Sequence, residues 1–283
     1  MPTSVAKELC KGRARYASDV VDSETTRASF SAQKTAFEDA GRHFGSPAVI
    51  GWLVANTPAE SADLVLDVAA GTSIYGRALA GRVAAVIAVD LTPEMLVEGK
   101  RAVEDVGLAN IVFQRGDATD LPFLNQSFDR VVSRLSIHHF EDALVPLAEM
   151  VRVCRIGGTI SIVDMVAPNE IVQARFNELE HKRDPAHTRA LTREQLHRSI
   201  ESEHCTITHT ASYDNVLVGD DWLAQTATPP AEAALIRRAW DQELAGGEAT
   251  GMLPRHGEHG IEFVHRWELV VAKVLSDSQP GSD

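Results

Sequence analysis

Between residues 64 and 167, short apolar runs alternate with segments of helical character. The apolar runs cover 64–69, 85–90, 110–117, 127–136 and 159–167. They are nearly continuous and lack polar–apolar alternation, which is typical of strands buried on both faces of a parallel sheet. The segments between them predict helices, including 93–106, which follows Thr92 as a possible N-cap and stops at Gly107, and 144–158, which a glycine pair ends. Strand–helix alternation predicts a doubly wound α/β fold.

Beyond Pro168 the pattern changes. The segments 206–213 and 261–274 alternate between polar and apolar residues and predict antiparallel strands. These two strands complete a mostly parallel, seven-stranded, Rossmann-like sheet. The expected organisation is an N-terminal helical arm or lid (1–43), one domain (44–275) and a disordered tail (276–283). Helical cap insertions are expected within the domain at about 168–191 and 216–258.

Composition narrows the class of ligand. Lys and Arg number 27 against 40 Asp and Glu, a formal net charge of −13 over 283 residues, which disfavours nucleic-acid binding and favours small molecules. The isolated cysteines Cys10, Cys154 and Cys205 indicate a reducing compartment. No apolar leader and no run of about 20 apolar residues occur in the chain, so we expect a cytoplasmic protein that does not enter a membrane.

The turn after the first predicted strand is the favoured ligand site, because ligands of open α/β sheets bind beyond the carboxyl ends of the strands. Its small residues are Gly71, Ser73 and Gly76. A hydrolase elbow, G-x-S-x-G, is disfavoured because Tyr75 stands at its last glycine. A dinucleotide loop is weakened because Ser73 occupies its middle glycine, and a turn without a ligand is the remaining alternative. Asp67 points to a ligand, because an acid that ends a buried strand is costly unless it binds something.

The stretch "LVLDVAAGTSIYG" (64–76) resembles motif I of class I S-adenosylmethionine-dependent methyltransferases. Four later segments resemble the following motifs in the same order: "VIAVDLTPEML", "FQRGDATDLPF", "FDRVVSRLSIHHF" and "MVRVCRIGGTISIVD". Together they cover residues 64–164, and the likeness is greatest to the ubiquinone/menaquinone-biosynthesis branch and its small-molecule relatives. One departure is Ser73, whose side chain is expected to intrude where the carboxypropyl tail of the cofactor should lie.

The resemblance implies that S-adenosylmethionine binds at three successive strand ends. Asp67 would orient the loop and meet the methionine amino group. Asp90 would accept hydrogen bonds from the ribose hydroxyls, although it could instead act only on the dipole of the following helix. Asp117 and the Ala118 N–H would bind adenine, against which Met95 would pack. The full expected set of cofactor contacts is Asp67, Ala69, Gly71, Ser73, Asp90, Leu91, Met95, Gly116, Asp117, Ala118 and Arg134.

The pair His138–His139 follows the fourth predicted strand, where this fold places acceptors. An imidazole suits a general base near neutral pH, and local packing is the alternative role. His138 is favoured on the expectation that His139 turns into the fold. The fourth strand ends without an acidic cluster, so no metal is predicted.

Residues of the arm and the cap are expected to line the acceptor pocket. In the arm these are Phe30 and Phe37, with packing on the core as the alternative. Within the first insertion Glu178, His181, Arg183, Asp184 and His187 cluster, most of them expected in solvent, with His181 and His187 the pocket candidates. Trp222 of the second insertion is expected in the pocket ceiling or the core.

The expected function is transfer of a methyl group from S-adenosylmethionine to an O, N or C atom of a small organic acceptor, leaving S-adenosylhomocysteine. A phenolic or quinone-type oxygen of a secondary metabolite is the leading acceptor, and an amine is next. The alternatives are a cyclase or other non-methylating enzyme that binds S-adenosylmethionine, an NAD(P)-dependent oxidoreductase, and a non-enzymatic interaction domain. We expect a monomer or a homodimer.

Overall fold

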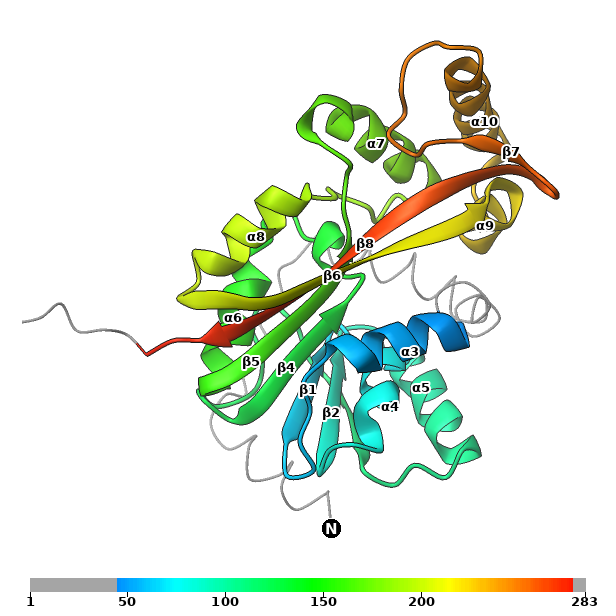
Figure 1. Cartoon of the computed structure of the whole chain (residues 1–283). Coiled ribbons are helices and arrows are strands. Elements are labelled where there is room, and N and C mark those ends of the chain that lie inside the picture. Colours follow the sequence, from blue (N-terminus) through cyan, green and yellow to red (C-terminus); the bar gives the residue numbers. More distant parts are fainter. Residues whose placement is uncertain (1–44, 277–283) are drawn as a thin grey trace, which may run out of the picture.

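A computed structural model describes residues 45–276. The predicted arm, with Phe30 and Phe37, and nearly all of the predicted tail lie outside the described residues. The centre of the structure is an eight-stranded sheet in the order β3-β2-β1-β4-β5-β8-β6, with β7 paired to β8 (Figure 1). The strands are β1 Leu64–Val68, β2 Ala85–Asp90, β3 Ile111–Arg115, β4 Phe128–Arg134, β5 Cys154–Met165, β6 Cys205–Val218, β7 Arg255–Gly257 and β8 Gly260–Val274.

Strands β1 to β5 are parallel, and β8 pairs antiparallel with both β5 and β6. The register places Asp67 beside Ala88 of β2 and Val132 of β4, so the carboxyl ends of the central strands lie at one edge. The doubly wound α/β fold is confirmed. The seven predicted strands form the main path of the sheet, and the three-residue β7 was not predicted.

Helices cover both faces of the sheet. They are α3 Pro47–Asn56, α4 Ile74–Ala80, α5 Pro93–Asp105, α6 Leu144–Val153 and α8 Arg193–Glu201. Val65 of β1 packs in one core with residues of α3 and α4, while the next residue, Leu66, packs in a second core with α6 and α8. Successive strand side chains point to opposite faces, so each apolar strand supplies both cores. This explains the continuous apolar runs in the sequence.

One predicted helix boundary is wrong. Helix α6 ends at Val153, and β5 already begins at Cys154, which pairs with Phe128 of β4. The glycine pair therefore belongs to the start of the strand. Gly158 lies where a Cβ would stand 2.7 Å from the Asp129 carbonyl, so the close approach of β4 requires glycine there.

Strands β6 and β8 continue past the end of β5 and carry a cap (Figure 1). Met165, the last residue of β5, pairs with Trp267, whereas the β6–β8 pairing runs on to Val218 and Glu262. Around this extension lie α7 Glu170–Arg183, α9 Gly219–Gln225 and α10 Pro230–Leu244. Asn169 caps α7 by accepting hydrogen bonds from the N–H groups of its first turn. The cap thus stands over the carboxyl ends of the parallel strands, with its own aromatic core.

Candidate functional site

The loop after β1 is held by Asp67. Its Oδ2 accepts hydrogen bonds from Ser73 Oγ at 2.8 Å and from Gly76 N at 2.9 Å. Ala69, Gly71 and Ser73 all have positive φ, of 50°, 55° and 59°, which makes the turn tight. Ser73 is fully buried, and its hydroxyl is directed at the carboxylate. It is therefore part of the loop scaffold, which also disfavours a nucleophile elbow.

Burial dominates the electrostatics of the Asp67 carboxyl. Burial raises its pKa to about 7, although the hydrogen bonds from Ser73 and Gly76 and the charge of Arg134 act in the opposite direction. Burial likewise lowers the pKa of Arg134, to about 10. The guanidinium of Arg134 lies over the ring of Trp267, 6.0 Å from its centroid. A cationic group placed near Asp67 would stabilise the carboxylate, which fits a ligand that carries an amino group.

Asp90 joins the loop to the start of α5. Its Oδ2 accepts from Gly71 N at 2.7 Å, and its Oδ1 accepts from Thr92 N at 2.8 Å. A Cβ at position 71 would stand 3.3 Å from Met95 Cε, so the buried Met95 lies directly beside the glycine. Leu91, which lies between Asp90 and Thr92 in the chain, is half-buried. Asp90 contacts both the loop and the start of α5. Its two expected roles, binding the ribose hydroxyls and interacting with the helix dipole, are therefore compatible.

The turn after β3 is also held by an aspartate at the end of a strand. Asp117 Oδ1 accepts from the backbone N and the hydroxyl of Thr119, at 2.8 and 2.7 Å. Gly116 donates its N–H to the Asp90 carbonyl, and a Cβ there would stand 2.6 Å from a methyl of Val89. Ala118 is buried. Adjacent strand ends therefore carry Asp67, Asp90 and Asp117 at one edge of the sheet.

These residues fit S-adenosylmethionine. Each carboxylate oxygen has two lone pairs, so the acids can hold their own turns and still accept from an amino group, ribose hydroxyls or an adenine amine. The glycine at position 71 keeps the loop backbone accessible beside Met95. The remaining expected contacts, Ala69, Leu91 and Arg134, lie at the same carboxyl ends of β1, β2 and β4.

His138 is hydrogen-bonded to Asp164, an acid for which the sequence predicts no role. In the short helix η2 Ile137–His139, His138 Nδ1 lies 2.5 Å from Asp164 Oδ1, and the His138 backbone N–H donates to Asp164 Oδ2 at 3.1 Å. Burial lowers the pKa of His138, but the Asp164 charge and hydrogen bond outweigh burial and raise it overall. Because Nδ1–H faces Asp164, Nε2 is the nitrogen that can exchange a proton. In the sequence, Asp164 is marked only as an acid near the end of an apolar run, the same signal that marks Asp67.

His139 is the less buried histidine of the pair. Its Nδ1 donates to the Ala186 carbonyl at 2.9 Å, and its ring centroid lies 4.1 Å from that of His138. Burial, and then the neighbouring His138, lower its pKa to about 4. Both rings point into the fold, His138 toward Asp164 and His139 toward the Ala186 carbonyl, and His139 stays the more exposed of the two.

The cap residues separate into two groups. His187 is buried with its ring 5.3 Å from His138, so the structure brings three histidines together, whereas His181 is exposed and bonds the His187 carbonyl. Arg183 and Asp184 are buried, which corrects the expectation that most of this cluster is in solvent. Trp222 is fully buried and packs edge to face on Phe263 within the cap.

The comparisons with known proteins decide the family. Residues 66–162 match the family model of a methyltransferase domain. The chain is 31% identical to the uncharacterised protein YafE of Escherichia coli over 159 residues, which make up 56% of this chain and 77% of YafE. The chain belongs to the class I S-adenosylmethionine-dependent methyltransferases. It is an S-adenosylmethionine-dependent methyltransferase in activity as well as in fold.

Two further relatives extend the comparison for this methyltransferase. The uncharacterised methyltransferase YcgJ of Bacillus subtilis is 29% identical over 181 residues, covering 64% of this chain and 72% of YcgJ. Its crystal structure has the same fold, with a TM-score of 0.73 at 24% identity over 80% of this chain and 98% of that one. Demethylmenaquinone methyltransferase of Beutenbergia cavernae is 36% identical over 110 residues, or 39% of this chain and 44% of that protein.

Two kinds of feature are missing from the part of the methyltransferase that the structure describes. Within residues 45–276, no group of three or more His, Cys, Asp or Glu side chains is arranged to hold a metal ion. Among the helices that the structure describes, none is both long and apolar enough to cross a membrane. The two described cysteines, Cys154 and Cys205, are free and buried.

Proposed function

We propose that this methyltransferase acts on an oxygen of a small phenolic or quinone-type acceptor, with His138 as the general base. The observation that carries the proposal is the buried His138–Asp164 pair at the carboxyl ends of β4 and β5. Such a pair serves an acceptor that must lose a proton, as a phenol does. The likeness to a demethylmenaquinone methyltransferase supports a quinone-type acceptor.

S-adenosylmethionine, when bound, supplies an electrophilic methyl group on a sulfonium. The carboxylate of Asp67 would bind the amino group and Asp90 the ribose hydroxyls. Asp117 and the Ala118 N–H would bind adenine beside Met95, with Leu91 and Gly116 lining the same turns. These contacts would hold the cofactor at the carboxyl ends of β1, β2 and β3. Alignment of a methyl donor with its acceptor can contribute several kcal/mol to lowering the barrier.

His138 would then take the acceptor proton. Its Nδ1–H remains bonded to Asp164, so Nε2 would accept the phenolic proton as the acceptor oxygen gains the methyl group and S-adenosylhomocysteine leaves with the electrons of the broken C–S bond. The resulting imidazolium is stabilised by the Asp164 carboxylate. Because the pKa of His138 is raised, it differs less from the pKa of a phenol, about 10, and proton removal is easier.

The test is the pH dependence of turnover in wild type, His138→Gln and Asp164→Asn, followed as S-adenosylhomocysteine formed from a panel of phenols and naphthoquinols. Wild-type kcat should rise with pH through a pKa above 6.5, since only neutral His138 is a base. Both variants should lose about 100-fold in kcat at unchanged affinity for S-adenosylmethionine. In Asp164→Asn the residual profile should move to lower pH, a change that a merely structural role would not produce.

The matched control is Asp105→Asn, an exposed acid at the end of α5 that should leave kcat unchanged. Unchanged turnover in His138→Gln would overturn the base assignment. A wild-type profile with a pKa near 4 would assign proton removal to His139 instead. Turnover of amines but of no phenol would overturn the acceptor class.

A further inference from the structure

Four buried side chains in the cap each have a polar atom without a hydrogen-bond partner among residues 45–276. The atoms are Glu180 Oε2, His265 Nδ1, His187 Nδ1 and Trp222 Nε1. All four side chains are at most 3% exposed. Buried polar groups are nearly always satisfied, because leaving one unpaired costs the full desolvation of that group. Four such atoms in one region of the cap indicate a missing partner.

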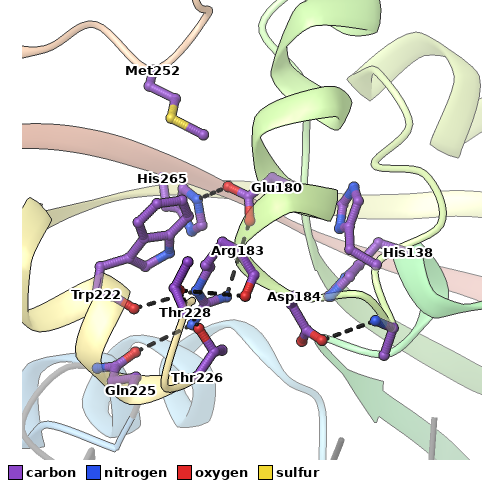
Figure 2. A network of polar contacts seen from close by, with 12 residues as sticks. His138, Glu180, Arg183, Asp184, Trp222, Gln225, Thr226, Thr228, Met252 and His265 are labelled. Atoms are coloured by element: carbon purple, nitrogen blue, oxygen red, sulfur yellow. Dashed lines mark hydrogen bonds and ion pairs between the residues drawn. The ribbon is translucent and has the colours of Figure 1, made fainter. Parts of the chain in front are cut away.

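Glu180, Trp222 and His265 come from α7, α9 and β8, and Figure 2 shows them gathered around Arg183. His187, in the loop after α7, lies close enough for the charges of Arg183 and His265 to lower its pKa. His265 Nε2 lies 2.6 Å from Glu180 Oε1, and the Arg183 guanidinium lies 4.0 Å from Glu180 Oε2. Arg183 also stacks 4.8 Å from the centre of the Trp222 ring, whose centroid is 5.9 Å from that of His265. The set thus forms one polar cluster inside the aromatic core of the cap.

The cluster begins beside the proposed base. The ring of His187 lies 5.3 Å from that of His138, and the backbone N–H groups of Thr188 and Arg189 donate to the His138 carbonyl. The negative charge of Glu180 is also among the groups that raise the pKa of His138. An acceptor placed with one group at His138 would therefore reach toward this cluster.

Among the four atoms without a hydrogen-bond partner are two acceptors and one donor. His187 directs Nε2–H at Asn177 Oδ1, an oxygen that also accepts from Ala190 N, and so His187 Nδ1 is an acceptor. Glu180 Oε2 is the second acceptor, and the donor is the indole N–H of Trp222. His265 Nε2 lies against Glu180 Oε1, which leaves Nδ1 as the nitrogen of that ring directed elsewhere.

The complementary ligand group is a neutral hydroxyl. A hydroxyl donates one hydrogen bond and accepts others, so it can satisfy Glu180 and Trp222 together. An ammonium group fits less well, because Arg183 and His265 already face the Glu180 carboxylate. The rings of Trp222 and Phe263 pack edge to face, 4.9 Å apart between centroids, so the cluster has aromatic surroundings.

We infer that Glu180, His265 and Trp222 form a recognition site for a second hydroxyl of the acceptor, so that this methyltransferase takes small aromatic acceptors with at least two hydroxyls. One hydroxyl lies at His138 and is methylated, and the other is bound in the cap. The inference rests on the proposed function for the place of the first hydroxyl. Recognition of the second is measured by binding alone.

The test is calorimetric titration of the full chain saturated with S-adenosylhomocysteine. The probes are 2,7-dihydroxynaphthalene, 2-naphthol and 7-(aminomethyl)-2-naphthol. Wild type should bind the diol at least about tenfold more tightly than 2-naphthol, because a site built around a hydroxyl leaves its own groups unpaired without one. Glu180→Gln and Trp222→Phe should each reduce this preference to about twofold or less, with unchanged affinity for 2-naphthol and S-adenosylhomocysteine. Glu178→Gln, an exposed acid on the same helix, is the control and should keep the preference.

Loss of S-adenosylhomocysteine binding would show that a variant is misfolded. The other of the two variants, Glu180→Gln or Trp222→Phe, then tests the inference. A wild type that binds no probe or shows no preference for the diol would overturn the inference, as would a preference that survives in both variants. Tighter binding of the aminomethyl probe would replace the hydroxyl site with an ammonium site. The titrations involve no methyl transfer, so this failure is distinct from a failure of His138 as the base.

Discussion

Ser73 Oγ donates a 2.8 Å hydrogen bond to Asp67 Oδ2, so the residue that replaces a loop glycine is bonded to the acid that ends β1. Ser73 has φ 59°, a left-handed conformation that costs a non-glycine residue about 1–2 kcal/mol. The hydrogen bond to a buried carboxylate offsets that cost. Ser73, the residue that departs from the family pattern, is therefore a structural link within the loop, because its side chain points toward Asp67.

Ser73→Ala should be more destabilising than Ser73→Gly. Alanine keeps the left-handed strain and loses the hydrogen bond, at a cost of about 1–3 kcal/mol. Glycine loses the same bond but relieves the strain, so its loss should be smaller by about 1 kcal/mol. Urea unfolding of the ligand-free protein measures both, with Ser202→Ala as the control at an exposed side chain whose hydroxyl donates to the Ser199 carbonyl of its own turn. If alanine proved no worse than glycine, the strain would have no energetic role.

Asp67 should make both stability and cofactor binding depend on pH. Its carboxyl has a pKa of about 7 in the folded protein against 3.8 as a free side chain. Between these values the folded state holds a proton that the unfolded state has lost, so its contribution to stability falls as pH rises from about 4 to 7. Asp67→Asn should remove that decline and stabilise the ligand-free protein at pH 8, by an amount on the order of a few kcal/mol.

Cofactor affinity should show the opposite trend. The amino group of S-adenosylmethionine is cationic and favours the carboxylate form, so wild-type affinity should weaken as pH falls through about 7. Asp67→Asn should bind more weakly at pH 8 and with a flatter pH profile. Calorimetry from pH 6 to 8.5 measures this, and Asp105→Asn should retain the wild-type profile. A pH-independent wild-type dissociation constant would exclude Asp67 as the partner of the amino group.

The strands and the acids at their ends could be predicted because their signals are local. Buried parallel strands are apolar along their whole length, so Asp67 and Asp90 stand out where each run stops. Asp164 shows the limit of this reasoning. It lies one residue before the end of β5, and its significance depends on His138, which is 26 residues away in the chain.

The cap was predicted least well, because its contacts join distant segments. Glu180 and His265 are 85 residues apart, and α7 has polar residues around its whole circumference, so no periodic pattern marks Glu180 as buried. The extension of β6 to Val218 similarly depends on pairing with β8 beyond the edge of the sheet. Such contacts are determined by tertiary packing, which a single sequence does not reveal through its periodicity.

Gly99→Ala should weaken cofactor binding from a distance. Gly99 lies in α5 where a Cβ would stand 2.6 Å from Phe113 Cε1 and 2.9 Å from the Thr72 carbonyl. Thr72 lies between Gly71 and Ser73, so the added methyl would push on the backbone of the cofactor loop. We expect a stability loss of about 1–3 kcal/mol and a higher dissociation constant for S-adenosylmethionine.

Gly51→Ala is the matched control for Gly99→Ala. Gly51 lies on the exposed side of α3, and a Cβ there would meet no heavy atom of the described chain within 4 Å. The same substitution should therefore stabilise the protein by about 0.5–1 kcal/mol and leave cofactor affinity unchanged. Thermal unfolding and calorimetry of the two variants separate helix propensity from contact with the loop. Wild-type affinity in Gly99→Ala would show that α5 does not control the position of Thr72.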